Sequence, residues 1–469
     1  MTRRHRGAMM TQPHGAEAPR TRREGSRGRS RWIGALALGA LAILLNGCEV
    51  TNPGPVQDQF LNDETSHEAL VRGAERRVMD ALSRHAYSGI AATTREVFPG
   101  GDSNSMPPLV QAGGLPQGEG DWNNLMQGRF IAEDALRRFA LPDVDAEPRN
   151  IAQAHIWAGY ALRILGENYC EAVIDGGPLE PSSVALTRAE THFTDAIAVA
   201  ANDDQRYAAY AGRAQIRLAL GNWAGATSDA AEVPITFRFQ VTPDRTQEPA
   251  RNYAGYYNDN TPYRVFTMKH TFFETYYPAT GDPRVPWRED PDFPFSGSRL
   301  TGYTQTADGR VPWLHLLEEG GETHYNPGTP ISLARGPEML LIRAEAILVQ
   351  TPANWAQALA LINQARMSYT SLTTGMPLEP WTASSAVETW THLKTERLIE
   401  GFMQGKRLHD IRRWTRDDTP GDLPWPDWTG LSSIFSADNQ SPFSSQGICF
   451  VVPNSERIAN PNIPDDLVS

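Results

Sequence analysis

The strongest constraint on the fold is one spacing of small and aromatic residues that occurs in two distant segments. In each segment a small residue is followed by a tryptophan nine positions later and by two further small or branched residues. The two sets are Ala214, Trp223, Ala226 and Ala230, and Ala346, Trp355, Ala358 and Ile362. Small residues at helical steps let one helix lie close against the next. The spacing therefore predicts two helical hairpins.

This pattern resembles the tetratricopeptide repeat, in which two helices flank a turn and a small residue lies at their contact. A looser match runs through Tyr160, Tyr169 and Ala172. Apolar residues recur at helical spacing over most of the chain. The predicted helices cover residues 64–84, 122–139, 151–165, 186–200, 207–220, 223–233, 338–348, 355–369 and 386–414. We therefore expect a mainly α fold.

Residues 234–335 differ from their flanks because proline and aromatic residues replace the helical periodicity. We predict an irregular lobe with short strands near residues 265–268 and 331–333. The expected organisation is an N-terminal helical region (64–233), the aromatic-rich lobe (234–335) and a C-terminal region (336–469). Residues 448–452 form one more apolar, strand-like run.

The first 47 residues read as a lipoprotein signal peptide. Arg27, Arg29 and Arg31 precede an apolar run at residues 33–45, which is shorter than the roughly 20 residues of a spanning helix. Gly47 and Cys48 follow, in the manner of a bacterial lipobox. Cys48 is then the expected lipidation site, bearing acyl chains such as palmitate, with residues 48–63 as a tether. An ordinary signal peptide with an incidental cysteine is the alternative.

The net charge and the cysteines indicate which partners the chain can bind and whether it contains a disulfide. The net charge is −12, and removing the nine arginines and two acids of the first 47 residues leaves −19 for the remainder. Such an acidic body repels phosphates, so we expect no nucleic-acid partner. Cys170 and Cys449 are the cysteines beyond Cys48. In an exported chain they favour a disulfide over two buried free thiols.

Three stretches resemble the RagB/SusD family of nutrient-uptake lipoproteins. They are Glu338–Ala346 (EMLLIRAEA) with 358–366 (ALALINQAR), Glu396–Trp414 (ERLIEGFMQGKRLHDIRRW), and 450–456 (FVVPNSE). Gly281-Asp282-Pro283-Arg284 is similar to a further family motif. Gln404 departs from the glutamate usual in the family, and Cys449 is a second departure.

The resemblance implies a SusD-like fold of tetratricopeptide-like hairpins packed against an irregular region. It also implies a surface-exposed, lipid-anchored protein of the cell outer membrane. Such a protein captures an oligosaccharide or peptide and delivers it to a SusC-like TonB-dependent transporter. Two other functions stay open: a protein-interaction scaffold of the cell envelope, and a surface glycoside hydrolase or peptidase.

Ligand capture requires exposed aromatic planes beside hydrogen-bonding groups, because a sugar stacks one face on a ring while its hydroxyls are bonded. The candidates are Tyr256, Tyr257, Asn258, Asp259, Tyr276, Tyr277 and Asn104. Core packing and turn formation are the competing interpretations of these residues. Trp122, Trp223 and Trp355 lie on helical patterns and are predicted to be in the core.

The charged stretch 396–413 contains paired carboxylates of the kind that serve in glycosidases. Each acid, however, has an arginine available at helical spacing or across the turn, which favours structural ion pairs. The predicted members are Glu396, Glu400, Arg407, Asp410 and Arg413. We found no nucleophile-elbow, zinc-protease or phosphate-loop motif, so the sequence predicts a non-catalytic protein without metal or cofactor.

Overall fold

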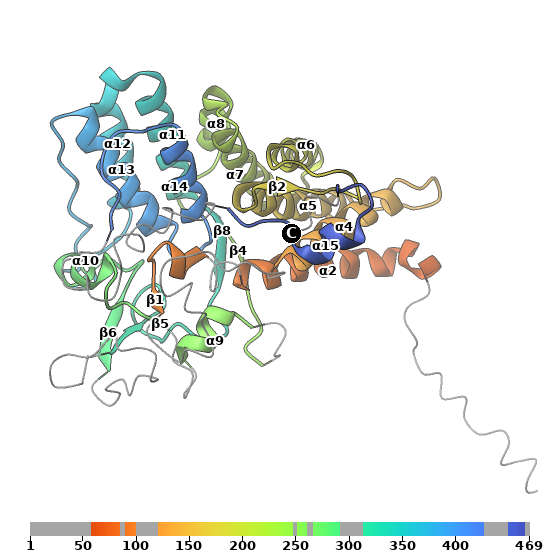
Figure 1. Cartoon of the computed structure of the whole chain (residues 1–469), viewed down its shortest axis with the longest axis horizontal. Helices are drawn as coiled ribbons and strands as arrows, with labels where there is room; N and C mark the ends of the chain where they lie inside the picture. The colour runs from red at the N-terminus through yellow and green to blue at the C-terminus, as the bar shows by residue number, and fades with distance from the viewer. Residues whose placement is uncertain are drawn as a thin grey trace, which may run out of the picture. The chain divides into compact units, whose positions relative to one another are not determined.

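The computed structural model describes residues 58–84, 90–99, 121–246, 251–259, 266–290, 313–425 and 449–464. They belong to one compact unit that begins at Asp58. The described part of the chain is mostly helical, as predicted (Figure 1). Its longer helices are α2 (Glu64–Arg84), α4 (Trp122–Phe139), α5 (Pro148–Asn168), α6 (Ser183–Val199), α7 (Asp203–Ala219), α8 (Trp223–Ala231), α11 (Gly336–Gln350), α12 (Trp355–Arg366), α13 (Ala386–Glu400) and α14 (Arg407–Arg416).

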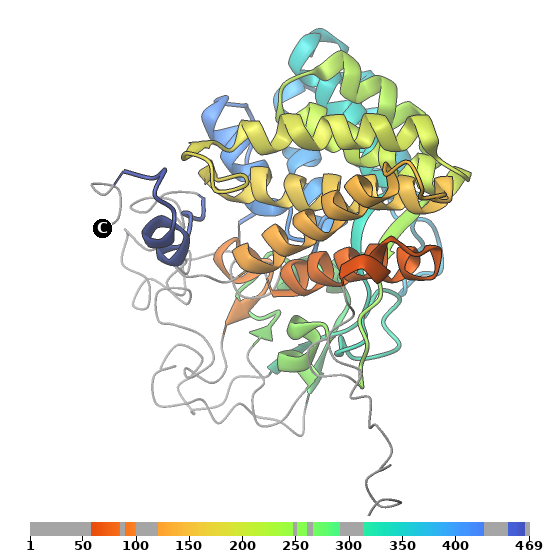
Figure 2. The same ribbon diagram turned by 90° about the vertical axis from the view of Figure 1, so that its right-hand side faces the viewer.

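From α2 to α8 each helix packs against the next one, and Figure 2 shows α2, α4, α5, α6 and α7 stacked beside one another in chain order. Phe193 of α6 illustrates how close this packing is. A Cβ atom added to Gly159 of α5 would lie 2.8 Å from the Phe193 ring, and one added to Gly212 of α7 would lie 2.3 Å from it. The two glycines therefore make room for one buried ring between three helices.

The repeated spacing marks two hairpins, α7–α8 and α11–α12, and α8 packs against α11. Ala214, Ala226, Ala346 and Ala358 are buried at the helix contacts. Trp122 is buried, but Trp223 and Trp355 are only half-buried, so the prediction of core positions was wrong for these two. Each opens the second helix of its hairpin, where its ring covers the edge of the core.

The region between the helical parts is built from short antiparallel pairs, β1–β5, β4–β8 and β6–β7. The strands are β1 (Phe98–Pro99), β4 (Arg238–Val241), β5 (Phe266–Thr267), β6 (Trp287–Asp290), β7 (Trp313–Leu316) and β8 (Ile331–Arg335). Two short helices also occur here, α9 (Tyr253–Asp259) and α10 (Phe273–Thr280). The sequence did not predict these helices, since each is no longer than about two turns and α10 contains Pro278.

The helical stretch predicted at residues 386–414 consists of two helices, which fits the helix–turn–helix form of the family motif at residues 396–414. α13 ends at Glu400 and α14 begins at Arg407. Met403 and Gly405 in the intervening turn have φ values of 56° and 70°, which a right-handed helix does not contain. The turn redirects the chain between the two helices, which the Arg397–Asp410 ion pair joins, and it places residues 402–404 close to β8.

The end of the chain is attached to the N-terminal helices. A disulfide joins Cys170 to Cys449, with their Cα atoms 5.1 Å apart. Phe450 forms an isolated parallel bridge with Tyr169, and α15 (Asn454–Ala459) follows. Arg457 then pairs with Glu171 of the β2 (Glu171–Ala172) and β3 (Glu180–Pro181) hairpin. The C-terminal segment is thereby held by covalent, polar and backbone contacts.

Residues 1–57, with the signal peptide and Cys48, lie outside the described part of the chain. The last residues of the predicted tether form the 3-10 helix η1 (Asp58–Asn62), where Asp58 accepts a hydrogen bond from Arg138. Within the described ranges, no helix has the length and apolarity required to cross a membrane.

Candidate functional site

A cavity of about 220 Å³ lies between strand β8, the loop that follows β7 and the turn between α13 and α14. Its walls combine charged, amide and hydroxyl groups with apolar side chains. The lining residues used below are Arg284, Glu318, Glu319, Ile331, Ser332, Arg335, Ile399, Phe402 and Gln404. The cavity thus brings together segments of the lobe, the end of α13 and the turn that follows it.

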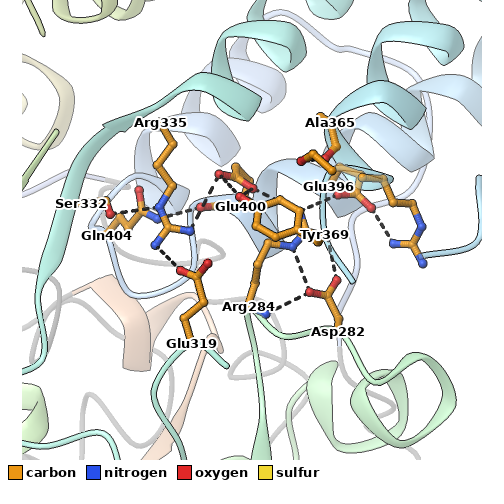
Figure 3. A network of polar contacts seen from close by, with 12 residues as sticks. Asp282, Arg284, Glu319, Ser332, Arg335, Ala365, Tyr369, Glu396, Glu400 and Gln404 are labelled. Carbon is orange, nitrogen blue, oxygen red and sulfur yellow. Dashed lines mark hydrogen bonds and ion pairs between the residues drawn. The ribbon is translucent and has the colours of Figure 1, made fainter. Parts of the chain in front are cut away.

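Arg284 forms the deep end of the cavity and the centre of a buried charge network (Figure 3). Its guanidinium pairs with Asp282 at 2.7 Å, with Glu396 at 3.0 Å and with Glu400 at 3.1 Å. All four side chains are no more than 2% exposed. The ring of Tyr369 lies under the guanidinium, 4.3 Å from its centroid.

The local sequence explains how Arg284 reaches this position. Gly281 ends α10 in the left-handed conformation with φ 63°, and a Cβ atom there would lie 2.4 Å from the Thr373 hydroxyl. The turn that follows lets Asp282 accept bonds from both the backbone and the side chain of Arg284. The Gly-Asp-Pro-Arg motif therefore directs the side chain of Arg284 toward α13.

The carboxylates of this network have opposite pKa shifts. Burial alone raises the pKa of Asp282, but the charge and hydrogen bonds of Arg284 outweigh it and lower the pKa below its usual value. Burial raises the pKa of Glu400, and the charges of Arg335 and Arg284 offset this only in part. Arg366 pairs with Glu396 at 2.7 Å on the far side. Cations at both ends, Arg335 and Arg366, thus balance the negative charge of the carboxylates in the network.

Arg335, at the end of β8, links this network to the mouth of the cavity. It pairs with Glu319 at 3.0 Å and approaches Glu400 to 3.9 Å, while its Nε donates to the Ser332 hydroxyl at 2.9 Å. Glu319 also binds Arg238 of β4 at 2.9 Å. Strand pairing between β4 and β8 therefore positions the two arginines on either side of one carboxylate.

Gln404 contributes an unsatisfied acceptor. Its side-chain nitrogen donates to the Glu400 carbonyl at 2.7 Å, which fixes the orientation of the amide. Its Oε1 atom is buried and has no hydrogen-bond partner among the described residues, although the residue is only 3% exposed. Buried acceptors are nearly always satisfied. Because Gln404 lines the cavity, its Oε1 atom is a candidate partner for a ligand donor.

A second hollow of about 500 Å³ lies between α4 and α6. Its carboxylates and cations bind one another: Glu133 accepts from Arg188 and His192, and Asp175 accepts from Arg129. Of the described side chains that line it, none has a buried polar atom without a partner. This hollow offers less to a polar ligand than the first cavity.

Among the predicted ligand residues whose side chains the structure describes, none lines either cavity. Tyr276 is buried, and its hydroxyl donates to Asp282 and accepts from Arg366, so the expectation of an exposed aromatic is corrected. Tyr277 and Tyr256 are half-buried, next to Trp287 and under Arg251 respectively. The side chains of Tyr257, Asn258 and Asp259, and the whole of Asn104, lie outside what the structure describes.

The predicted ion-pair residues are all buried, but several partners differ from those expected. Asp410 binds Arg397 at 2.8 Å and Arg413 at 3.1 Å, and Arg413 also binds Glu345. Glu396 and Glu400, in contrast, pair with arginines remote in sequence, because they point away from α14 and toward Arg284.

Arg407 departs furthest from the expectation. It donates to the carbonyls of Thr94 and Pro424 at 3.2 Å and forms no ion pair within 4 Å among the described residues. Burial lowers its pKa to about 10. Glu319, Ser332 and Arg335 were not identified as site residues from the sequence. The only local indication of Ser332 and Arg335 is that they lie on or beside a predicted strand that precedes a predicted helix.

No three His, Cys, Asp or Glu side chains in the described ranges are grouped as metal ligands would be. Neither Glu396 nor Glu400 is among the described residues that line the cavity. A pair of glycosidase carboxyls must face the scissile bond from both sides. The arrangement is suited to binding a small polar group, with the carboxylates as its support.

Comparison with known proteins gives a consistent result. The model of the SusD family matches residues 175–447. A SusD superfamily protein from Bacteroides vulgatus is 14% identical, with a TM-score of 0.59 over 86% of this chain and 98% of the other. A SusD homolog from Bacteroides thetaiotaomicron is 13% identical, with a TM-score of 0.58 over 88% and 98%.

A third similar structure is surface glycan-binding protein A from Bacteroides uniformis. It is 12% identical, with a TM-score of 0.57 over 87% of this chain and 100% of the other. At these identities the similarity concerns the fold. No curated protein matches the chain.

Proposed function

The chain belongs to the SusD family, and from this premise we propose that it is a lipid-anchored nutrient-binding protein of the outer membrane. It captures a glycan or a peptide and passes it to a SusC-like, TonB-dependent transporter. The anchor is Cys48, and the protein is displayed on the cell surface. Its contribution to uptake is binding and hand-over, without chemical conversion of the nutrient.

The observation that carries this proposal is the cavity with its unsatisfied Gln404 oxygen, set in a SusD-type fold. A buried acceptor without a partner costs free energy, and a ligand that supplies a donor removes that cost. A similar structure is named a surface glycan-binding protein, which favours a glycan over a peptide. Tyr256 and Tyr277 are half-buried and remain proposed contacts for a longer ligand.

The absence of turnover is also part of the proposal. Glu396 and Glu400 share Arg284, and each has a second arginine nearby. A general acid must hold a proton within reach of the substrate. Both side chains are at most 2% exposed and lie behind the cavity wall, which supports a structural role for the pair.

The test is to purify the lipid-anchored protein from native outer membranes and to identify by mass the proteins that accompany it. We expect a barrel receptor in a stoichiometric amount. The Cys48→Ser variant is the matched control and should be lost from the membrane fraction. Recovery of the anchored protein alone, or with other envelope proteins only, would contradict the transporter role and favour a scaffold built on the helical hairpins.

A further inference from the structure

We propose that this cavity is a binding site for one neutral, hydroxyl-rich ring of the nutrient, held by Gln404 and Ser332 against an apolar wall. The inference rests on the proposed function and specifies its ligand: a single uncharged sugar unit, and neither an acidic sugar nor a charged amino-acid side chain. Three features of the cavity lead to it.

The first feature is the balance of charge. Arg284 is compensated by Asp282, Glu396 and Glu400, and Arg335 by Glu319, which also binds Arg238. Glu318 accepts hydrogen bonds from Thr323, Asn326 and Thr329. Each cation among the described lining residues already has a carboxylate partner, with which a carboxylate ligand would have to compete. A charged ligand would enter a poorly solvated space without a counter-charge, which is costly.

The second feature is the pair of open hydrogen-bonding positions. The Gln404 amide is oriented by its bond to the Glu400 carbonyl, so Oε1 can only accept. The Ser332 hydroxyl accepts from Arg335 Nε, and its own hydrogen donates to no described acceptor. One open acceptor and one open donor are complementary to hydroxyl groups, each of which both donates and accepts.

The third feature is the apolar part of the wall. Ile399, Phe402 and Ile331 line the same cavity as Gln404 and Ser332. Phe402 is fixed by edge-on packing with Phe273, whose ring centroid is 4.8 Å away. A sugar ring has an apolar face of C–H groups and an edge of hydroxyls, so it can meet both kinds of wall at once.

The volume limits the ligand to one unit. Pockets that hold drug-sized molecules measure about 300–1,000 Å³, and this cavity has about 220 Å³. The remainder of a longer glycan would have to lie outside, past Arg335 and Glu319 at the mouth. The cavity therefore selects the end or a side branch of a chain.

The experiment is a ligand-observed NMR titration of the purified protein. The neutral probes are glucose, galactose, mannose, xylose and N-acetylglucosamine, and the charged counterparts are glucuronic acid and glucosamine. We expect at least one neutral sugar to bind, and a charged counterpart to bind at least tenfold more weakly. Equal affinity for neutral and charged probes, or no binding of any neutral probe, would overturn the proposal.

Two variants locate the binding. Gln404→Met removes the open acceptor with little change of volume, and Ser332→Ala removes the open donor. Each variant should lower the affinity for the sugar about three- to tenfold, which is the loss expected for one hydrogen bond. Gln350→Met and Ser368→Ala, at exposed positions, are the matched controls and should bind normally. Melting temperatures show whether each variant is folded before it is titrated.

The outcomes separate this inference from the proposed function. If the transporter co-purifies and polymeric glycans bind while both cavity variants retain full affinity, the cavity proposal is wrong and the uptake function stands. If no transporter co-purifies and no glycan binds, the proposed function itself fails. Weakened binding in both cavity variants, with unchanged controls, supports the site.

Discussion

Replacing Arg284 with methionine should be among the most damaging single changes to this protein. The substitution keeps most of the side-chain length and removes a cation that three carboxylates share. Asp282, Glu396 and Glu400 are 0%, 0% and 2% exposed, so water cannot take over the lost interactions. The result is buried negative charge with incomplete compensation.

Removing one partner of a buried ion pair costs about 3–5 kcal/mol. We expect a loss in this range and not a multiple of it, because Arg366 still binds Glu396 and the Tyr276 hydroxyl still binds Asp282. If the roughly 400 residues of the compact unit unfold together, the unfolding entropy is about 0.9 kcal/mol per kelvin. The melting temperature should therefore fall by about 3–6 °C.

Scanning calorimetry at pH 8 and pH 5 tests both the size and the cause of the loss. Without Arg284, the folded-state pKa of the remaining carboxylates rises above the unfolded value, so the folded variant gains stability relative to wild type as the pH falls. The difference in melting temperature between wild type and Arg284→Met should therefore be smaller at pH 5 than at pH 8. Arg284→Lys should be intermediate, because lysine keeps the charge but loses the planar fork.

The exposed pair of Arg72 and Glu68 supplies the control. Arg72→Met removes the same charge at a site where water replaces the interaction, so the melting temperature should hardly change. If Arg284→Met is no more destabilising than Arg72→Met, or if its deficit is independent of pH, the argument from buried charge is wrong.

Four further outcomes are expected. The double variant Cys170→Ser with Cys449→Ser should lower the free energy of unfolding by about 2–5 kcal/mol, and calorimetry with and without reductant checks it. Burial raises the pKa of Glu96 to about 7. The protonated side chain therefore stabilises the folded state at low pH, and this contribution is lost as the pH rises from about 4.5 to 7. Relative to wild type, the stability of Glu96→Gln should be higher at pH 8 than at pH 5. Cys48→Ser should abolish labelling with radioactive palmitate. Glu400→Gln should lower the melting temperature, and a glycan cleaved by wild type but not by this variant would contradict the binding-only proposal.

The helices were the most predictable part of the fold, because their periodicity is a local property of the sequence. The predicted spans 64–84 and 122–139 coincide with α2 and α4. Periodicity alone does not show where a few residues override the pattern. The turn at Met403 and Gly405 divides an otherwise continuous helical stretch.

The site was less predictable because its parts come from separate segments. Arg284 lies 112 and 116 residues from Glu396 and Glu400, and helical spacing reports only neighbours along one helix. The register of β4 with β8 places Arg238 beside Arg335, and both bind Glu319 of the loop after β7. No local sequence pattern specifies this arrangement. Gln404 was visible in the sequence as a departure from the family motif. Only the structure shows that its oxygen lacks a partner inside a cavity.

The charge network and the cavity are two parts of one construction. Arg335 belongs to both, since it binds Glu319 at the mouth and approaches Glu400 in the interior. Glu400 also orients Gln404 through its backbone carbonyl, so the open acceptor is held by the same residue that anchors two arginines. A binding site needs its hydrogen-bonding atoms fixed before the ligand arrives, because ordering them afterwards weakens binding. Under the proposed function, the buried carboxylates that first suggested catalysis serve binding, through the rigidity that they give to the wall of the cavity.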